Sequence, residues 1–487
     1  MVHKRIKSTT NDHDNERTNL ISRNPSTYNP QDNVTQEEET KVILKLDFRI
    51  LPLTALLYLS AYLDRGNLGN ARLQGLQSEL LNNSDERFSK VLSSFFVTYI
   101  LLSIPGTLLA KAISPSNAIS IGAIIWSTST TLISLCNTYH QLIFLRLLIG
   151  VGEALFGQSV ALYYSMWYKK QEVGPRLALF IGAGVSAGGF GGLIAYGISL
   201  LGSNTWRLLF LIEGIPSILI ALAIIFWLPS RPDGTRFLKT SEKAIVLKRL
   251  KEDGVYEVRV DWSGVKRAFT DWKSYAIAVL YSCMNLTLGS VSGFLPSIIS
   301  SMGHEGPIAQ LYSVPPYFVA FLVMTLISIG SSRYNTRAIP IAGVFLVSSI
   351  GWMILLLVNG YDHFRYFATF LIVIGGYAAI PLIIGWVSNN TGSESQRAIS
   401  LGMLNSIGQL LAILSSFLFS NSNWKLGFKV NIFFNLLAMM ISILMRSYYI
   451  YENKRRDLVF ENLDGKHDLS PGMFLLPYEL DQSSSST

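Results

Sequence analysis

Residues 206–229 read WRLLFLIEGIPSILIALAIIFWLP, an almost continuous apolar stretch that contains one acid, Glu213. A bilayer core about 30 Å thick needs about 20 helical residues to cross it. Similar charge-poor stretches recur from Phe48 to Ile450. Backbone polar groups within hydrocarbon must pair internally, and the sequence lacks the alternating pattern of a membrane barrel. The chain is therefore predicted to be an all-α membrane protein.

The overall composition agrees with this fold class and excludes several functions. Of 487 residues, 49% are hydrophobic and 15% are charged, against about 25% charged residues in soluble proteins. The net charge is +8, but the basic residues do not form one patch with interleaved aromatics, so we expect no nucleic-acid partner. Cys136 and Cys283 both lie in apolar stretches, which predicts neither a disulfide framework nor a metal site. No Walker motif is present, so we expect neither an enzyme nor a cofactor.

The apolar stretches predict twelve transmembrane helices in two groups of six. The predicted spans are 49–71, 88–112, 117–136, 141–166, 176–202, 206–229, 274–302, 308–331, 338–358, 364–387, 397–420 and 427–451. A charged, partly amphipathic linker separates the groups. The predicted domains are a disordered N-tail (1–45), an N-terminal bundle (46–229), the linker (230–273), a C-terminal bundle (274–451) and a C-tail (452–487).

Lys and Arg residues set the predicted orientation. Cytoplasmic loops of membrane proteins carry an excess of these residues. Most of the 40 basic residues fall in tails and alternate loops on one side, which predicts that both termini are cytoplasmic. The sequon at Asn82 then lies in the first outside loop, where it is either glycosylated or unused.

Ionisable side chains within the spans are the main functional candidates, because burying a charge in a bilayer costs a few kcal/mol or more. Asp64 and Arg65 lie in the first span, and Arg146 and Glu153 lie in the fourth. At about 1.5 Å per residue, Asp64 lies about 22 Å from the inner face, with Arg146 about 8 Å and Glu153 about 18 Å below the outer face. Arg146 and Glu153 are two helical turns apart on one face, so both can face the same cavity.

Two acids and two arginines in one bundle suit the coupling of protons to an anion. The charge of a nearby arginine controls whether a desolvated carboxylate binds a proton, and an arginine also binds a substrate carboxylate through two hydrogen bonds. The alternative is a purely structural role as ion pairs, or contact of Asp64 and Arg65 with the outer interface. For Glu213, packing or gating is favoured over substrate contact.

Four aromatic and polar residues of the spans are further candidates. Tyr62, Tyr99, Trp386 and Asn405 either line a cavity or, for the aromatic residues, anchor the helices at the membrane interface. The glycine-rich stretch 182–192 lies inside an apolar span, which favours close helix packing over phosphate binding.

Several strings, in this order, resemble those of the major facilitator superfamily, in its anion:cation symporter family and fungal allantoate permease branch. They are YLDRGNLGNARL (62–73), RLLIGVGEA (146–154), SMWY (165–168), WRLLFLIEG (206–214), FLPSII (294–299), VPPY (314–317) and WVSNNT (386–391). The resemblance implies two six-helix bundles around a central cavity that alternate access by rocking.

The resemblance also implies roles for individual residues. Asp64 and Glu153 correspond to proton-coupling acids, Arg65 to a substrate-binding residue and Arg146 to the arginine that interacts with the acids. A second group is placed near substrate: Tyr62, Tyr99, Trp386 and Asn405. The chain departs from the family at SIPGT (103–107) and at Ser332, where acids of the cytoplasmic gates are expected, and these departures put turnover in doubt.

The sequence thus predicts a monomeric, proton-coupled symporter of a small organic anion, a vitamin-acid type of monocarboxylate such as nicotinate. Protons are the coupling ion, and the lipid bilayer is the surrounding partner. The plasma membrane is the expected location, with the endoplasmic reticulum or vacuole as alternatives. Two other functions remain open: a sensor of the same fold that does not transport, and an uncoupled facilitator.

Overall fold

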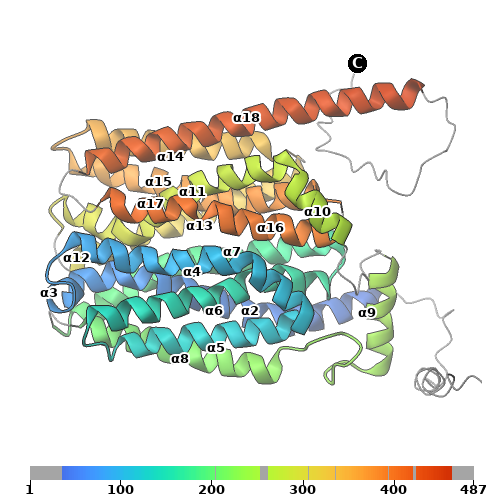
Figure 1. Ribbon diagram of the computed structural model, residues 1–487, viewed down its shortest axis with the longest axis horizontal. Helices are drawn as coiled ribbons and strands as arrows, with labels where there is room; N and C mark the ends of the chain where they lie inside the picture. The colour runs from blue at the N-terminus through green and yellow to red at the C-terminus, as the bar shows by residue number, and fades with distance from the viewer. Residues whose placement is uncertain are drawn as a thin grey trace, which may run out of the picture.

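The chain folds into two bundles of long helices that lie side by side (Figure 1). The computed structural model describes residues 36–202, 205–252, 262–304, 307–334, 336–392, 394–419 and 424–462. Every regular element in these residues is a helix. The predicted all-α fold with twelve spans in two six-helix bundles is confirmed.

The N-terminal bundle is formed by the first six long helices. These are α2 (Gln36–Ala71), α4 (Asp85–Ile113), α5 (Pro115–Ile133), α6 (Tyr139–Ser165), α7 (Lys170–Ser199) and α8 (Trp206–Trp227). The short helices η1 (Arg72–Leu76) and α3 (Gln77–Glu79) continue α2 at its end. Two linker helices follow, α9 (Thr240–Glu252) and α10 (Trp262–Thr270).

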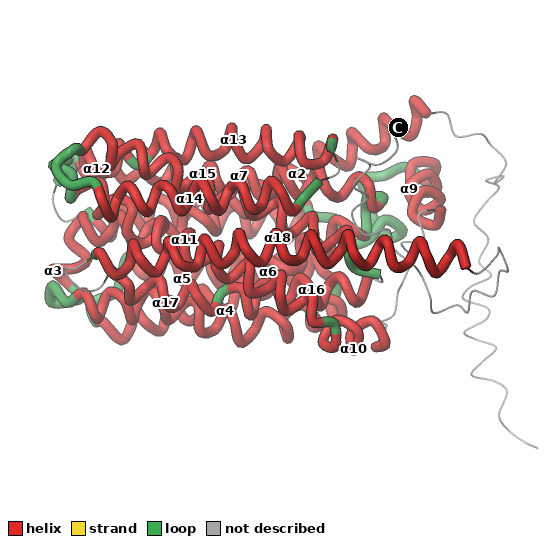
Figure 2. Tube along the Cα trace, turned by 90° about the horizontal axis from the view of Figure 1, so that it is seen from above, coloured by secondary structure: helices red, strands yellow, loops and turns green. Residues whose placement is uncertain are grey.

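The C-terminal bundle repeats this arrangement, with two of its spans divided. Its helices are α11 (Trp272–Ser300), α12 (Pro307–Tyr312), α13 (Val314–Arg333), α14 (Ala338–Leu357), α15 (Asp362–Asn389), α16 (Glu394–Gly408), α17 (Leu410–Leu418) and α18 (Lys425–Asn462). Figure 2 shows α9 and α10 at one end of the molecule and α3 and α12 at the other. We call these ends the linker side and the distal side.

Ten of the spans within the described residues are long and apolar enough to cross a membrane by length and hydropathy alone. The other two are α2 and α5. Asp64, Arg65, Asn67 and Asn70 lower the mean hydropathy of α2, and serine and threonine residues lower that of α5. The first span is therefore polar where it carries the candidate site.

The tails contain more helix than the sequence predicted, whereas helix α9 lies in the linker where an amphipathic helical pattern was predicted. Helix α2 begins at Gln36, so residues 36–45, predicted to be disordered, continue the first span as a helix. Helix α18 likewise extends past 451 to Asn462, and the linker contains α9 and α10. The remainder of the predicted tails, 1–35 and 463–487, lies outside the described residues.

Small residues allow the helices of the N-terminal bundle to approach closely. A Cβ atom on Gly152 of α6 would lie 2.6 Å from the carbonyl oxygen of Gly122 and 2.7 Å from the backbone nitrogen of Trp126, both on α5. In the glycine-rich stretch of α7, a Cβ atom on Gly188 would overlap the ring of Tyr317 on α13. The predicted role of that stretch in close helix packing is confirmed.

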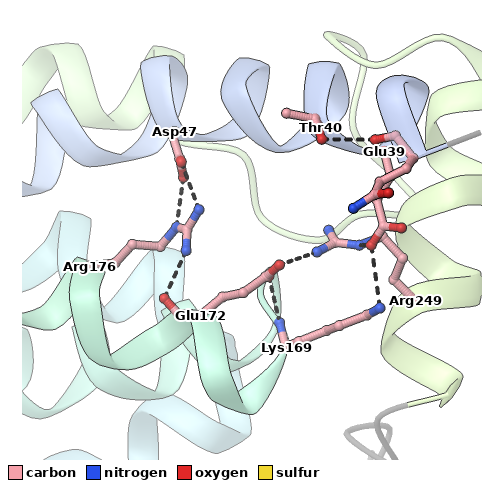
Figure 3. A network of polar contacts seen from close by, with 8 residues as sticks. Glu39, Thr40, Asp47, Lys169, Glu172, Arg176 and Arg249 are labelled. Carbon is pink, nitrogen blue, oxygen red and sulfur yellow. Dashed lines mark hydrogen bonds and ion pairs between the residues drawn. The ribbon is translucent and has the colours of Figure 1, made fainter. Parts of the chain in front are cut away.

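An ion-pair network attaches the linker to the N-terminal bundle (Figure 3). Arg249 of α9 is 4% exposed and donates to Glu39 of α2 and to Glu172 of α7. Lys169 also pairs with Glu39, at 3.3 Å. Burial by itself raises the pKa of the Glu39 carboxyl, but hydrogen bonds and charges from Arg249 and Lys169 outweigh it and lower that pKa below its ordinary value.

The same network continues along the linker side of the bundle. Arg176 of α7 donates to both carboxylate oxygens of Asp47 at 2.7 Å, and Lys45 pairs with Glu242 of α9 at 2.7 Å. Helix α9 is therefore held to α2 and α7 by charges that come from all three helices.

The two cysteines are free thiols that are removed from solvent. Cys136 lies just after the distal end of α5 and is 2% exposed, and Cys283 in α11 is fully buried. Neither forms a disulfide. The described residues contain no group of three or more His, Cys, Asp or Glu side chains that could hold a metal ion.

Candidate functional site

Two cavities lie between the bundles, one nearer the linker side and one nearer the distal side. The linker cavity encloses about 710 Å³ and the distal cavity about 670 Å³, including space open to solvent. Tyr62, Arg65 and Gln409 line both cavities, so they form the wall between them.

Arg65 of α2 and Glu153 of α6 meet at the linker cavity. The Arg65 Nε donates to Glu153 Oε2 at 2.6 Å, and the Arg65 Nη2 donates to the same oxygen. The Glu153 side chain is 1% exposed, whereas that of Arg65 is 20% exposed. The second oxygen of Glu153 has no hydrogen-bond partner among the residues that the structure describes. The pair thus joins two helices, and its arginine is accessible from the cavities.

Aromatic rings surround the Arg65 guanidinium. Its central carbon lies 4.9 Å from the ring centre of Tyr62, 5.1 Å from that of Phe95 and 5.3 Å from that of Tyr99. Rings at this distance stabilise a cation, by about 2 kcal/mol or more where it is desolvated. Three rings therefore help to keep the charge of Arg65 at the centre of the protein.

Arg146 of α6 lines the distal cavity and differs from Arg65 in having no acid in contact. It is 1% exposed, and its Nε and Nη1 have no hydrogen-bond partner. Its guanidinium lies 5.8 Å from the ring centre of Phe95, and it interacts electrostatically with Glu153 and Asp64. Among the described residues, no carboxylate lies within ion-pair distance of Arg146.

Asp64 lies on the side of α2 that faces away from the cavities. It is fully buried, and its Oδ2 accepts a hydrogen bond of 3.1 Å from the indole N–H of Trp126 on α5. Its Oδ1 has no partner. Asp64 lines neither cavity, so any effect on Arg65 or Glu153 acts through electrostatics or movement of α2.

The structure separates the remaining predicted site residues. Tyr62, Tyr99 and Asn405 line the linker cavity, and Asn405 comes from the opposite bundle. Trp386 does not reach either cavity: it is fully buried on α15, with its ring centre 5.9 Å from that of Tyr449 on α18.

Sequence reasoning missed several polar residues of the cavities, most of them in the C-terminal bundle. They are Tyr58, Tyr281, Asn285, Tyr317, Tyr377 and Gln409. Tyrosine and amide side chains in the middle of apolar spans, not at the span ends, were the signal that could have found them.

The bundles close against each other on the distal side. The Gln74 side-chain N–H donates to Gln310 at 3.3 Å, which joins η1 to α12. The Arg72 guanidinium lies 4.7 Å from the ring centre of Phe88 in one bundle and 5.8 Å from that of Phe294 in the other. These contacts place polar and aromatic side chains between the distal cavity and the distal surface.

Comparison with known proteins agrees with this architecture. Residues 54–412 match the model of the family described as Major Facilitator Superfamily. The chain belongs to the major facilitator superfamily. It is 34% identical over 444 residues to an uncharacterized transporter of Schizosaccharomyces pombe, covering 89% of this chain and 92% of that protein. It is 28% identical to the high-affinity nicotinic acid transporter of Saccharomyces cerevisiae, covering 87% and 80% of the two chains.

Solved structures support the same fold. A partially occluded inward-open structure of the Escherichia coli xylose transporter XylE superposes with a TM-score of 0.65 at 15% identity, covering 81% of this chain and 96% of that one. The protein is therefore a multi-pass member of a fungal branch of this transporter superfamily and not an enzyme. Transport implies a small-molecule substrate.

Proposed function

We propose that the protein carries a small organic anion across the membrane together with protons, by alternating access of the cavities between its bundles. The observation that supports this most is the Arg65–Glu153 ion pair at the wall of the linker cavity. We further propose that it acts as a monomer in the plasma membrane, with the linker side in the cytoplasm and no cofactor other than protons.

The ion pair provides a physical route to coupling. A carboxylate substrate that binds Arg65 competes with Glu153 for the same N–H groups. Displaced Glu153 would be a buried anion without a partner, which costs several kcal/mol unless it binds a proton. Binding of the anion and binding of a proton therefore favour each other. Unpaired Arg146 adds positive potential that attracts the anion to the distal cavity.

The cavity lining favours a planar aromatic or heteroaromatic monocarboxylate. Tyrosine rings from both bundles line the cavities and offer surfaces on which a flat ring stacks. Amides of the C-terminal bundle, Asn285 and Gln409, offer hydrogen bonds to a ring heteroatom. The similarity to a nicotinic acid transporter supports nicotinate as the first compound to test.

The direct test is uptake of a panel of labelled organic acids by cells that express the protein, at acidic and at neutral pH. We expect one aromatic monocarboxylate to accumulate above its outside concentration, more strongly at acidic pH, and a protonophore to abolish the accumulation. Arg65→Lys should abolish binding, because a lysine lacks the planar fork that matches a carboxylate. Accumulation that is unaffected by pH and by the protonophore would contradict proton coupling.

A further inference from the structure

A second polar cluster lies inside the N-terminal bundle, outside both cavities. It is formed by Asp64 and Asn67 on α2, Thr130 on α5 and Glu213 on α8. Each of these residues is at most 4% exposed. Among the described residues, neither oxygen of Glu213 has a hydrogen-bond partner at normal geometry, and the same is true of the Thr130 hydroxyl and of both polar atoms of the Asn67 amide. Buried polar groups are normally satisfied, so a cluster with this many unpaired atoms requires an explanation.

The charges of the bundle do not balance. Away from its two ends, the described part of the bundle contains two arginines, Arg65 and Arg146, and three acids, Asp64, Glu153 and Glu213. If all were ionised, one negative charge would be left over in a region where an uncompensated charge costs several kcal/mol. One bound proton removes the excess.

Of the three acids, Glu213 has the fewest contacts that stabilise a carboxylate. Glu153 is paired with Arg65, and Asp64 accepts a hydrogen bond from Trp126 and interacts with Arg146. Glu213 faces the Asn67 amide, and within the described part of the chain no cation lies near it. An amide presents a donor and an acceptor, so Asn67 can accept from a protonated Glu213 and can donate to an ionised one.

The helices packed against α8 supply no other charge to Glu213. Helix α5 contains no titratable residue, and α2 contributes Asp64, which interacts electrostatically with Glu213. Arg72 of η1 is engaged by Asp85 at 2.6 Å, and Tyr196 is the only titratable residue in the distal half of α7.

We propose that Glu213 and Asp64 form a second proton-binding site, in which Glu213 holds the proton in this conformation and passes it to Asp64 during the transport cycle. The transfer converts a Glu213 carboxylic acid and an Asp64 carboxylate into a Glu213 carboxylate and an Asp64 carboxylic acid. No electrons or other reactants are needed. Movement of Arg146 away from Asp64, toward a bound anion, drives the transfer because it removes the positive potential at Asp64. This role in the cycle rests on the proposed proton coupling.

The test uses infrared spectroscopy on the purified full-length protein in lipid nanodiscs at neutral pH. We expect a carbonyl band of a protonated carboxyl group in the wild type that is lost in Glu213→Gln. The control is Glu86→Gln, the same chemical change at an exposed residue that pairs with Lys90 at 2.7 Å. Glu213→Asp retains the acid and should shift the band. The proposal is overturned if the wild type lacks the band, or if the band persists in Glu213→Gln.

Uptake measurements then separate this site from the proposed function. We expect Glu213→Gln to bind the anion with wild-type affinity but to move fewer protons per anion and to show a flatter dependence of uptake on pH. A wild-type proton stoichiometry and pH profile in this variant would overturn the transfer step. If wild-type uptake is independent of protons while the Glu213 band is present, the proposed coupling fails and the transfer step with it, whereas the proton-binding site stands.

Discussion

Replacing Glu153 with glutamine tests the central ion pair directly. The change keeps the shape of the side chain and removes the negative charge that Arg65 contacts. In the proposed mechanism, an incoming carboxylate displaces Glu153, and hydrogen bonds to charged groups contribute about 1.5–3 kcal/mol each. Since about 1.4 kcal/mol corresponds to a tenfold change in affinity, we expect Glu153→Gln to bind the anion about ten- to a hundredfold more tightly.

The pH dependence of the same variant is the more specific result. In the wild type, binding should tighten as the pH falls, because protonation of Glu153 releases Arg65. In Glu153→Gln this dependence should disappear, and accumulation in cells should be lost while exchange of labelled for unlabelled anion continues. Titration calorimetry on the purified protein at acidic and neutral pH measures the affinities, with Glu86→Gln as the control. Unchanged affinity together with an unchanged pH dependence would refute the competition between Glu153 and substrate.

Three further predictions concern stability. Arg249→Ala removes the ion pairs of α9 with Glu39 and Glu172 and should lower the free energy of unfolding by about 1–3 kcal/mol. The loss should appear as a lower melting temperature and as faster hydrogen exchange of α9. Lys248→Ala, at an exposed position of the same helix, should change neither. The folded pKa of Glu39 lies below its ordinary value of 4.5. Its contribution to docking of α9 should therefore be complete above pH 4.5 and lost as the pH falls through the lowered pKa. Protection of the α9 amides from exchange that stays constant across acidic pH would contradict this prediction. Gly152→Ala should destabilise the N-terminal bundle by about 1–3 kcal/mol or more, because its Cβ would overlap α5. Gly174→Ala should not, because nothing lies within 4 Å of that position. Equal yields of folded protein from both variants would argue against the close contact.

The fold could be predicted from the sequence because lipid imposes a strong pattern. Apolar stretches of fixed length identify most spans, and the charged linker divides them into two bundles. The predicted ends were less accurate. Helix α2 continues to Gln36 because its first turns are stabilised by Arg249, which is distant in sequence and invisible to a local pattern.

The candidate site could be predicted only in part. Buried charges are rare in spans, so Asp64, Arg65, Arg146 and Glu153 stood out. Depth along the helices placed Asp64 and Arg146 at a similar level, but it could not show that Asp64 faces α5 while Arg65 faces the cavities. Rotation of a helix about its axis depends on its neighbours. For the same reason the sequence could not separate Asn405, which lines the linker cavity, from Trp386, which packs against α18.

The two shielded thiols give the protein a practical property. A membrane-impermeant maleimide should react little with the native chain, since both sulfur atoms are out of its reach. A single cysteine introduced at Gln74 or at Leu177 would then be the main reactive position, without prior removal of the natural ones. Labelling of one position that slows as labelling of the other quickens would record, in the purified protein, how the protein divides its time between facing one side of the membrane and facing the other.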